Sequence, residues 1–558
     1  MAPFTRRHFL RSALAAAGST AVAGAAGVLF GPRGRSGTSG LARLARRSAF
    51  PGSILGAGLA SGHLLRDGMR FPEPSEELRT GIAIVGGGIS GLSAAWELGR
   101  QGAGDYLLLE LESEAGGNAR GGLNSVSAYP WGAHYLPLPG PEAIHVRELL
   151  EELGVITGHD ASGLPIYDEL VLCADPHERL LMHGMWQEGL VPSSGLTEQD
   201  RAELKRFFAL MEDYRQARGH DGRPAFAIPV AESSRDPRFT GLDAHSMADF
   251  LSRHGFGSAS LKWYVNYCCR DDYGTEMREV SAWAGVHYFA SRRGKAANAD
   301  SQTVLTWPEG NAWLAGRLRA KAGSRIRPDS LVFNVEPEAS GVIIDSFNPS
   351  LKKTTRIRAG AAIVAAPRFV AARILKRLRE DRPEYLKSFS YAPWMVANVT
   401  VSGIPKGPGA EPSWDNVSYH SPSLGYIIAT HQGLGYRPGK TVLTYYLPLS
   451  GEAPEQARKS AVARSHAEWA ALICDDLESM HPGISRTIEH LDVWLWGHGM
   501  IRPRPGFIWG GDRERALLPE GRIFFAHSDM SGISIFEEAQ AHGVRAARDA
   551  VGAIGRRT

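Results

Sequence analysis

A cluster of glycines after a short apolar run constrains the fold more than any other stretch. Residues 82–85 read Ile-Ala-Ile-Val, which is typical of a buried parallel strand, and Gly86-x-Gly88-x-x-Gly91 follows directly. A helical pattern continues from Leu92. Gly86 permits a tight turn, Gly88 lets a pyrophosphate approach the backbone, and Gly91 allows close packing of helix on strand. The N–H groups at the helix start can then bind phosphate.

The segment after this helix supports a dinucleotide site. Residues 106–109 form a second apolar run, and Glu110 follows it. An acidic residue at this position can accept hydrogen bonds from a ribose hydroxyl. Strand, glycine turn, helix and strand together predict a Rossmann-like unit that binds an adenine dinucleotide, either NAD or FAD. A purely structural glycine turn is the alternative.

The overall composition argues against other classes of protein. With 558 residues, the chain is long enough for two or more domains. Its 62 basic and 59 acidic side chains leave a net charge of +3, too small for a typical nucleic-acid-binding protein. The four cysteines have no zinc-ligand spacing and the histidines form no H-E-x-x-H motif, so we expect no metal site and buried thiols, with an isolated disulfide as the alternative.

The N-terminal residues resemble an export signal. Arg6-Arg7 lies in a twin-arginine motif, and a weakly apolar, Ala- and Gly-rich run covers 12–30. We therefore expect a signal segment at 1–40, a linker at 41–77, and export to the periplasm by the twin-arginine machinery. A membrane anchor that stays uncleaved is the alternative.

A paired glycine beyond the second strand distinguishes this site from a plain NAD site. Gly116-Gly117 is followed by Asn118 and Arg120. Together with the first glycine turn and Glu110, this arrangement resembles the FAD-binding amine oxidase and phytoene desaturase superfamily. In that superfamily the paired glycines and a following arginine contact the cofactor phosphates. Asn118 stands where the arginine usually stands, and Arg120 is the candidate replacement.

The resemblance extends to later segments. It implies that Gly132 lies beside the isoalloxazine ring, Val335 meets the adenine through its backbone, and Asp529 lies near the ribityl chain. A capping box of Ser534 and Glu537 would open a helix whose N-terminus faces the flavin and stabilises its anionic reduced form. Since no cysteine lies near this motif, the resemblance implies non-covalent FAD. An aromatic core and an ordinary terminal helix are the structural alternatives.

The superfamily's organisation implies two discontinuous domains. The expected fold is α/β, with a Rossmann-like FAD-binding domain at 78–140, 301–380 and 500–558 and a substrate domain at 141–300 and 381–499. Alternating apolar residues at 394–401 and 441–447 predict a sheet in the substrate domain, with helices behind it. Ser246 and Asp249 resemble a capping box that opens one of these helices.

The resemblance implies a flavin-dependent oxidoreductase. Its reaction would be hydride transfer from a carbon of a small-molecule substrate, first of all an amine, with oxygen or a periplasmic electron acceptor as the final oxidant. The substrate-side candidates are aromatic and imidazole residues: His134, Tyr135, Trp313, Trp496 and His498. Taken singly, each is also consistent with a structural role.

One departure from the superfamily keeps the reaction open. Many amine oxidases carry a lysine that holds a water near the reactive flavin nitrogen, and the corresponding strand around Val396 has none. Two alternatives therefore stand beside amine oxidation: a desaturase-like oxidoreductase for an apolar substrate, and a flavin-binding redox or assembly protein without turnover. The cofactor motifs do not identify the substrate.

Overall fold

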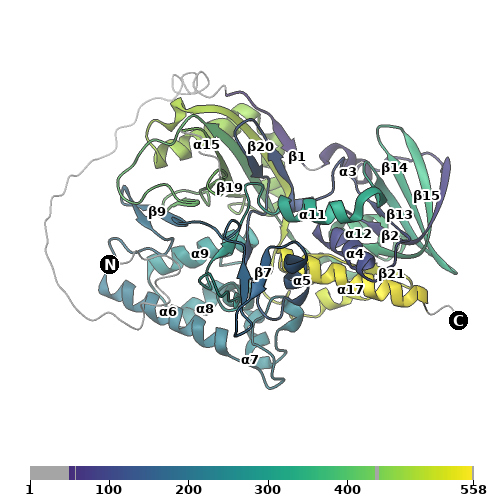
Figure 1. Cartoon of the computed structure of the whole chain (residues 1–558), viewed down its shortest axis with the longest axis horizontal. Helices are drawn as coiled ribbons and strands as arrows, with labels where there is room; N and C mark the ends of the chain where they lie inside the picture. Colours follow the sequence, from purple (N-terminus) through teal and green to yellow (C-terminus); the bar gives the residue numbers. More distant parts are fainter. Residues whose placement is uncertain (1–49, 57, 434–438, 556–558) are drawn as a thin grey trace.

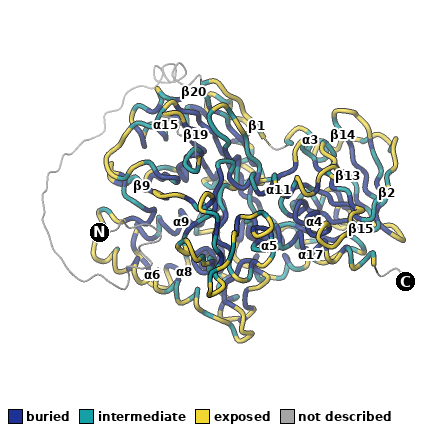
Figure 2. The backbone as a smooth tube through the Cα atoms, viewed as in Figure 1, coloured by how far each residue is buried: buried dark blue, intermediate teal, exposed yellow. Residues whose placement is uncertain are grey.

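The computed structural model describes residues 50–56, 58–433 and 439–555, which form two lobes (Figure 1). The twin-arginine motif and the run after it lie outside the described residues. One lobe contains the glycine turn on a seven-stranded sheet, and the other contains an eight-stranded sheet with a group of helices. Buried backbone runs through both lobes (dark blue in Figure 2).

The first lobe is built on a mixed sheet. Six strands follow the order β12-β3-β2-β15-β14-β13, and β21 pairs with the second half of β15. Their bounds are β2 (Glu76–Val85), β3 (Tyr106–Leu109), β12 (Ile326–Arg327), β13 (Leu331–Glu338), β14 (Gly341–Asn348), β15 (Lys353–Val364) and β21 (Ile523–Phe525). Val85 lies opposite Leu109 and Val364 in parallel register, so three strands end at one edge. Ligand-binding loops leave a parallel sheet at such an edge.

Strand β15 brings the C-terminal part of the chain to this edge. Its first half pairs antiparallel with β14, and its second half lies parallel between β2 and β21. Ala362, for example, is opposite both Ala83 and Ile523. This central segment is fully buried, as its uninterrupted apolar sequence predicts.

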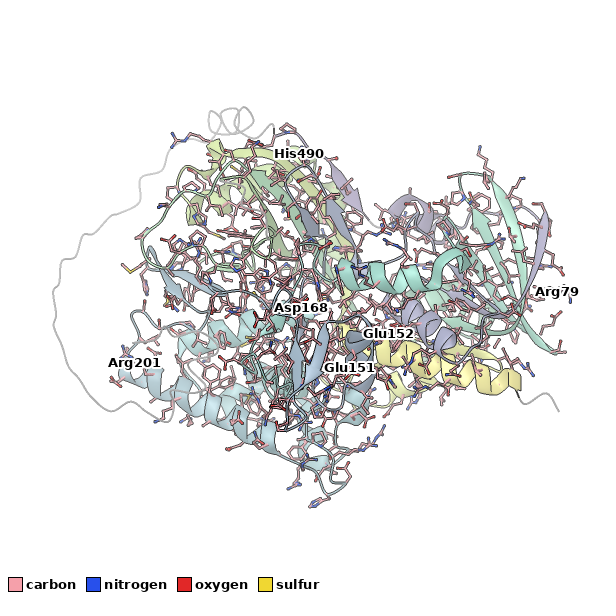
Figure 3. The ribbon with its side chains drawn as sticks, in the orientation of Figure 1. Arg79, Glu151, Glu152, Asp168, Arg201 and His490 are labelled. Atoms are coloured by element: carbon pink, nitrogen blue, oxygen red, sulfur yellow. The ribbon has the colours of Figure 1, made fainter. Side chains whose placement is uncertain are left out.

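Helices α4 and α17 pack side by side on this sheet. The helices of the lobe are α3 (Leu59–Arg66), α4 (Ile89–Arg100), α5 (Ile144–Glu152), α11 (Ala312–Ala322), α12 (Arg368–Ile374), α13 (Lys376–Asp381), α16 (Asp512–Leu517) and α17 (Phe536–Gly555). A Cβ atom on Gly543 of α17 would lie 2.2 Å from Ser90 O of α4, so only glycine permits this approach. Glu152 of α5, labelled in Figure 3, accepts a hydrogen bond from Trp96 Nε1 of α4 at 2.7 Å and pairs with Lys321 of α11.

The second lobe is built on a sheet of order β1-β20-β16-β19-β18-β17-β9-β10. The bounds are β1 (Ile54–Gly56), β9 (Glu178–Met182), β10 (Met185–Glu188), β16 (Tyr391–Val401), β17 (Asp415–Ser418), β18 (Tyr426–Ile428), β19 (Thr441–Pro448) and β20 (Ile488–Ile501). Every residue of β16 is buried. Met395 and Ala397 pack with α15 (His466–Met480) on one face, while Trp394 and Val396 belong to the core of the other face.

Helices cover both faces of this sheet. They are α6 (Glu198–Gln216), α7 (Pro237–Thr240), α8 (Met247–Arg253), α9 (Ala259–Tyr273), α10 (Ala282–Ala290), α14 (Pro454–Ala463) and α15. The predicted capping box of Ser246 and Asp249 is confirmed at the start of α8. A second box, Thr197 with Asp200, opens α6.

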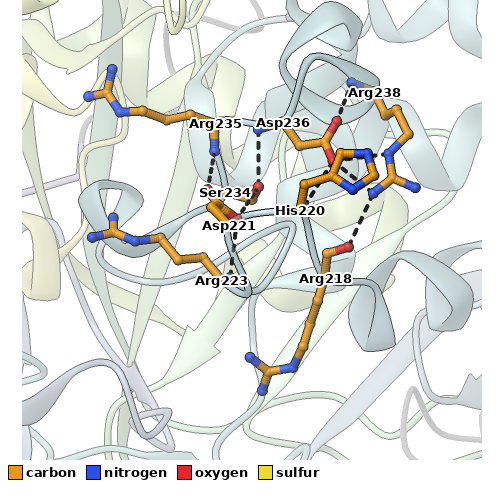
Figure 4. A network of polar contacts seen from close by, with 8 residues as sticks. All are labelled: Arg218, His220, Asp221, Arg223, Ser234, Arg235, Asp236 and Arg238. Atoms are coloured by element: carbon orange, nitrogen blue, oxygen red, sulfur yellow. Dashed lines mark hydrogen bonds and ion pairs between the residues drawn. The ribbon is translucent and has the colours of Figure 1, made fainter.

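A polar network fixes the loop before α7. Asp221 accepts a hydrogen bond from Ser234 Oγ at 2.8 Å, and Asp236 pairs with Arg238 at 2.7 Å (Figure 4). Within the same loop, Val230 N–H donates to Glu538 Oε1 of α17 at 2.6 Å. The loop thereby joins the helical layer of the second lobe to the terminal helix of the first.

The expected linker at 41–77 contains regular structure where it is described. Strand β1 pairs in parallel with β20, and α3 lies on the other lobe (Figure 1). Strand β2 begins at Glu76, two residues before the predicted domain start. The partners of β1 and α3, strands β20 and β13, lie far away in the chain, so no local pattern predicts these two elements.

The other elements are short. They are β4 (Gly121–Leu123), β5 (Ala128–Pro130), β6 (Leu136–Pro137), β7 (Ile156–His159), β8 (Pro165–Tyr167), β11 (Val304–Leu305), η1 (Gly117–Ala119), η2 (Val230–Glu232), η3 (Gly241–Ala244), η4 (Gly323–Arg325), η5 (Glu384–Ser388), η6 (Ile484–Arg486) and η7 (Ser528–Met530). In the described part of the chain, no helix combines the length and apolar character that crossing a bilayer requires. Three or more potential metal ligands do not gather anywhere among these same residues. The four cysteines are buried thiols.

Candidate active site

A cavity of about 1660 Å³ lies where the two lobes meet, and residues of both lobes line it. The first lobe contributes the glycine turn after β2, the end of β3, and the segment that leads into α17. The second contributes the face of β16 and β20 that points away from α15, together with α9. A ligand in this cavity would therefore contact segments from nearly the whole chain.

The first glycine turn has the geometry that the spacing predicts. Gly86 has φ +104°, and Gly88 is the N-cap of α4 without a side-chain cap. A Cβ atom on Gly91 would lie 1.9 Å from Gly86 O, so Gly91 serves packing and lies outside the lining. A Cβ atom on Gly88 would meet only Gly117 Cα, at 3.9 Å. Space beside Gly88 is therefore open to a phosphate group.

Glu110 is fixed at this turn by two backbone groups. Its Oε2 accepts Gly87 N–H at 2.7 Å and its Oε1 accepts Glu112 N–H at 2.8 Å. Burial raises the pKa of this carboxyl, and the two N–H groups oppose that effect. The carboxyl group lies on the cavity wall, where a ribose hydroxyl can reach it.

The paired glycines form a second turn against the first. Gly117 has φ +56°, and its Cβ would lie 3.0 Å from Gly88 Cα; Gly116 lies behind the lining. Asn118 Nδ2 donates to Gly499 O. Arg120 lines the cavity, but its guanidinium pairs with Glu112 at 3.3 Å.

Aromatic side chains surround the turn at Gly132. Tyr446 donates its hydroxyl hydrogen to Gly132 O at 2.9 Å, and its ring lies 4.7 Å from that of His134. Burial lowers the pKa of His134 to about 4, so this imidazole is neutral near pH 7. Tyr135 accepts a hydrogen bond from Arg292 at 3.2 Å. All these side chains line the cavity.

Carboxylates from distant segments line the same part of the cavity. Asp271 comes from α9 and Asp415 from β17. Burial, followed by the charges of Asp415 and Asp271, raises the pKa of Tyr446, which lines the cavity together with them. Asp272 also lines the cavity and pairs with Arg292 at 2.8 Å.

Asp529 lies in a buried hydrogen-bond network. It accepts hydrogen bonds from Tyr391 Oη at 2.5 Å and Arg368 N–H at 2.8 Å, and it pairs with His527 at 2.9 Å. Burial alone would raise the pKa of this carboxyl, but His527 and the two donors hold it below its usual value. Asp529 is therefore ionised and fixed on the cavity wall.

The remaining candidates have different surroundings. Trp496 lines the cavity and donates to Trp131 O at 2.6 Å. His498 also lines it and stacks on Phe369, with ring centres 4.1 Å apart. Burial, then Arg458 and Arg373, lower the pKa of His498 to about 4.

Three predicted site residues have partners that the sequence did not indicate. Trp313 stacks on Trp307 at 4.8 Å and lies outside the lining. Val335 pairs with Ile344 within the sheet, and Val332 of the same strand lines the cavity. Ser534 lines the cavity but accepts Ile501 N–H at 3.0 Å, and α17 begins two residues later.

Sequence reasoning missed the acidic part of the cavity. Asp271, Asp415 and Tyr446 lie on three segments that only the tertiary fold brings together. The alternation in 441–447 predicts a strand, but no local pattern shows which face of that strand borders a cavity.

Comparisons with known proteins agree with this architecture. The family model for an NAD(P)-binding Rossmann-like domain matches residues 84–153. The chloroplastic protoporphyrinogen oxidase of Oryza sativa subsp. japonica is 24% identical in an alignment 357 residues long, which covers 59% of this chain. The match spans 60% of that relative's length.

Solved structures of similar fold extend over most of the chain. Putrescine oxidase bound to putrescine has a TM-score of 0.62 at 17% identity, covering 85% of this chain and 100% of its own. Cyclohexylamine oxidase from Brevibacterium oxydans has a TM-score of 0.59 at 17% identity, with coverages of 85% and 98%. A CLA-producing fatty acid isomerase from P. acnes has a TM-score of 0.55 at 16% identity, with coverages of 84% and 98%.

The mixed α/β fold of this chain, with its Rossmann-like domain and multi-sheet substrate domain, is that of the flavin amine oxidases. The fold expectation is thus confirmed. The Rossmann-like domain fits FAD, because two glycine turns leave an open cradle at the start of α4 and Glu110 lies beside it. Residues of both glycine turns, Asn118, Gly132 and Asp529 line this same cavity of about 1660 Å³.

Proposed function

We propose that this protein is an FAD-dependent oxidoreductase that oxidises an amine at the carbon next to nitrogen. The observation that carries this proposal is the pair of carboxylates, Asp271 and Asp415, near Tyr446 on the cavity wall. Carboxylates in a partly desolvated cavity attract an ammonium group and disfavour an anionic one.

The chain's own residues would bind and orient the substrate. Asp271 and Asp415 hold the amine end, while Tyr446 is fixed through its hydrogen bond to Gly132 O. His134 stays neutral beside them and therefore does not repel a cation. FAD, when bound, supplies the two-electron acceptor. Hydride leaves from the neutral amine, so the bound ammonium group first releases one proton to a cavity carboxylate or to solvent.

An anaerobic flavin-reduction assay tests the proposal. Putrescine and cyclohexylamine should bleach the flavin, and neutral or acidic analogues of similar size should not. Asp415→Asn and Asp271→Asn should each raise the half-saturating amine concentration about tenfold, as expected for one lost charged contact. Asp475→Asn, at an exposed position of α15, is the control and should leave the half-saturating amine concentration unchanged. If no amine bleaches the wild-type flavin, amine oxidation is excluded.

A desaturase-like reaction is the second candidate, favoured by the missing lysine at Val396, which lines the cavity. Bleaching by an apolar, uncharged substrate and not by amines would identify it. Oxygen or a periplasmic carrier would reoxidise the flavin in either case. Flavin without turnover toward any donor would indicate a redox or assembly role.

Export is part of the proposal and is supported by the Arg6-Arg7 motif. Replacing both arginines by lysine should retain the protein, with its flavin, in the cytoplasmic fraction. Arg11→Lys is the matched control. Periplasmic recovery of the double variant would contradict the assignment.

A further inference from the structure

The segment that precedes the Rossmann-like domain crosses from one lobe to the other. We define Ser53–Gly56 and Gly58–Asp67 as the N-terminal strap. Its strand β1 pairs with β20 of the second lobe, and Ser53 N–H donates to Asp492 Oδ1 at 2.9 Å. Its helix α3 lies on the first lobe, beside β13 (Figure 1). The strap precedes the residues matched by the family model.

The strap forms a wall of the cavity. Ile54–Gly56, Gly58–His63, Leu65 and Arg66 line it together with residues of the two glycine turns. Gly58 has φ +43°, and a Cβ atom there would lie 2.3 Å from Glu112 Oε1. A Cβ atom on Gly62 would lie 3.8 Å from Leu111 Cδ2. Gly58, the N-cap of α3, and Gly62 within this helix therefore lie beside Leu111 and Glu112, the residues that follow Glu110 in the chain.

Helix α3 makes little buried contact of its own. None of its eight residues is buried. A helix this short is not stable through its intrinsic propensity and needs a packed face. Its inner face, which includes Gly62 and His63, points into the cavity. A ligand in the cavity would complete the packing of this helix.

Positive charge gathers on the same wall. His63 and Arg66 of α3 and Arg373 of α12 all line the cavity. Arg66 Nη1 lies 3.3 Å from His63 Nε2, and burial, then Arg66 and Arg373, lower the pKa of His63, so the imidazole is neutral near pH 7 and the two guanidinium groups carry the charge. Arg66 pairs with Asp67 at 2.7 Å, while no carboxylate of the described residues pairs with Arg373. The glycine turns offer N–H groups but no cation, and Arg120 is already paired with Glu112.

We infer that the strap is the outer wall of the dinucleotide site, where it packs on the adenosine diphosphate part of FAD and contributes positive charge through Arg66 and neighbouring Arg373. This inference rests on the binding of FAD but not on the substrate. It has a structural consequence. Because no residue of α3 is buried by the protein alone, we expect bound FAD to cover this helix and to order it.

Binding of FAD and ADP to the apo-protein tests the charges. ADP carries the adenosine diphosphate group without the flavin. Arg66→Gln and Arg373→Gln should each weaken binding of both ligands about tenfold, as for one charge-assisted contact, while riboflavin binding stays unchanged. Arg377→Gln on α13 is the matched control, because this arginine is exposed and pairs with Asp381. Unchanged FAD and ADP affinity in both strap-side variants would overturn the inference.

Limited proteolysis tests the packing without any substitution. Thermolysin should cleave the apo-protein between Leu64 and Leu65, and saturating FAD or ADP should slow this cleavage at least tenfold. Equal cleavage rates with and without ligand would contradict an ordered strap. If the wild-type chain retains no FAD at all, the proposed function fails; if FAD binds and the strap is insensitive to it, only the present inference fails.

Discussion

Gly88 shows how one residue without a side chain creates a binding surface. It is the N-cap of α4, its side-chain position faces the cavity, and Gly117 of the second turn is its nearest neighbour. The phosphates of a dinucleotide need that space and the N–H groups behind it.

Gly88→Val should abolish flavin retention during purification. The two added methyl groups would occupy the phosphate position, and the fold itself has room for them on the cavity side. Flavin content per protein, measured by absorbance, checks this. Gly99→Ala on the same helix is the control, because a Cβ atom there meets nothing within 4 Å. Wild-type flavin content in the Gly88 variant would show that the phosphates bind elsewhere.

Two buried carboxyl groups at the start of α17 link protonation to stability. Burial raises the pKa values of Glu537 and Glu538 to about 7, although Ser531 and Val230 N–H donate to Glu538 and oppose the shift. The folded state therefore keeps protons that the unfolded chain releases above its ordinary carboxyl pKa. Their stabilisation is complete below pH of about 4.5 and is lost as the pH rises through about 7.

Glu538→Gln should reduce the loss of stability between pH 5 and pH 8. A buried carboxyl with such a shift costs on the order of 3 kcal/mol at high pH. Urea unfolding at the two pH values measures the difference for the holo-protein. Glu212→Gln on the exposed side of α6 should leave the pH dependence unchanged. The same decline in the Glu538 variant and the wild type would exclude this linkage.

At the scale of elements, α17 is placed by its contact with α4. Both helices border the cavity at their N-termini, and Gly543 allows them to approach each other. The contact at Gly543, two turns further along α17, therefore fixes where the first turn of this helix lies relative to the cofactor. Packing transmits such shifts because interiors have little free space.

Gly543→Val should destabilise the protein and weaken FAD binding, although residue 543 does not line the cavity. Overpacking of this kind costs about 1–3 kcal/mol. Thermal unfolding and FAD titration measure the two effects. Gly552→Val lies on the same helix with open space around it, so it controls for helix propensity. If both variants have the same thermal stability and the same affinity for FAD, the close contact between α4 and α17 does not affect FAD binding.

For the whole molecule, the cofactor cavity lies between two lobes with separate sheets and cores. Ligand contacts to both lobes join them energetically, because anything that binds only the folded chain stabilises it by mass action. The N-terminal strap and β15 are the chain segments that complete this junction.

Removal of FAD should lower the melting temperature and separate the unfolding of the two lobes. At a free FAD concentration a hundredfold above Kd, the stabilisation is about 2.7 kcal/mol. Scanning calorimetry of apo- and holo-protein measures it, with riboflavin as the ligand control. A single transition at the same temperature in both forms would show that FAD contributes no linkage between the lobes.

Local patterns predicted the features that depend on neighbouring residues. The glycine turn at Gly86–Gly91, its flanking strands and the capping box at Ser246 follow from spacing and are present in the structure. The structure of β1 and α3 did not follow, because both are stabilised by segments hundreds of positions away. The stacking of Trp313 on Trp307 was likewise not predicted, because the aromatic content of a turn does not specify which rings pack on each other.

The sequence by itself determined the class of cofactor, since glycine spacing, an acidic strand end and backbone N–H groups define a phosphate cradle within one continuous segment. Only the tertiary structure decided what surrounds that cradle. Asp271, Asp415 and Tyr446 line one cavity because α9, β17 and β19 surround it in the folded chain. The strap lines the same cavity because β1 pairs with β20. The charge and shape of a cavity depend on residues from distant parts of the chain, so no local sequence pattern predicts them.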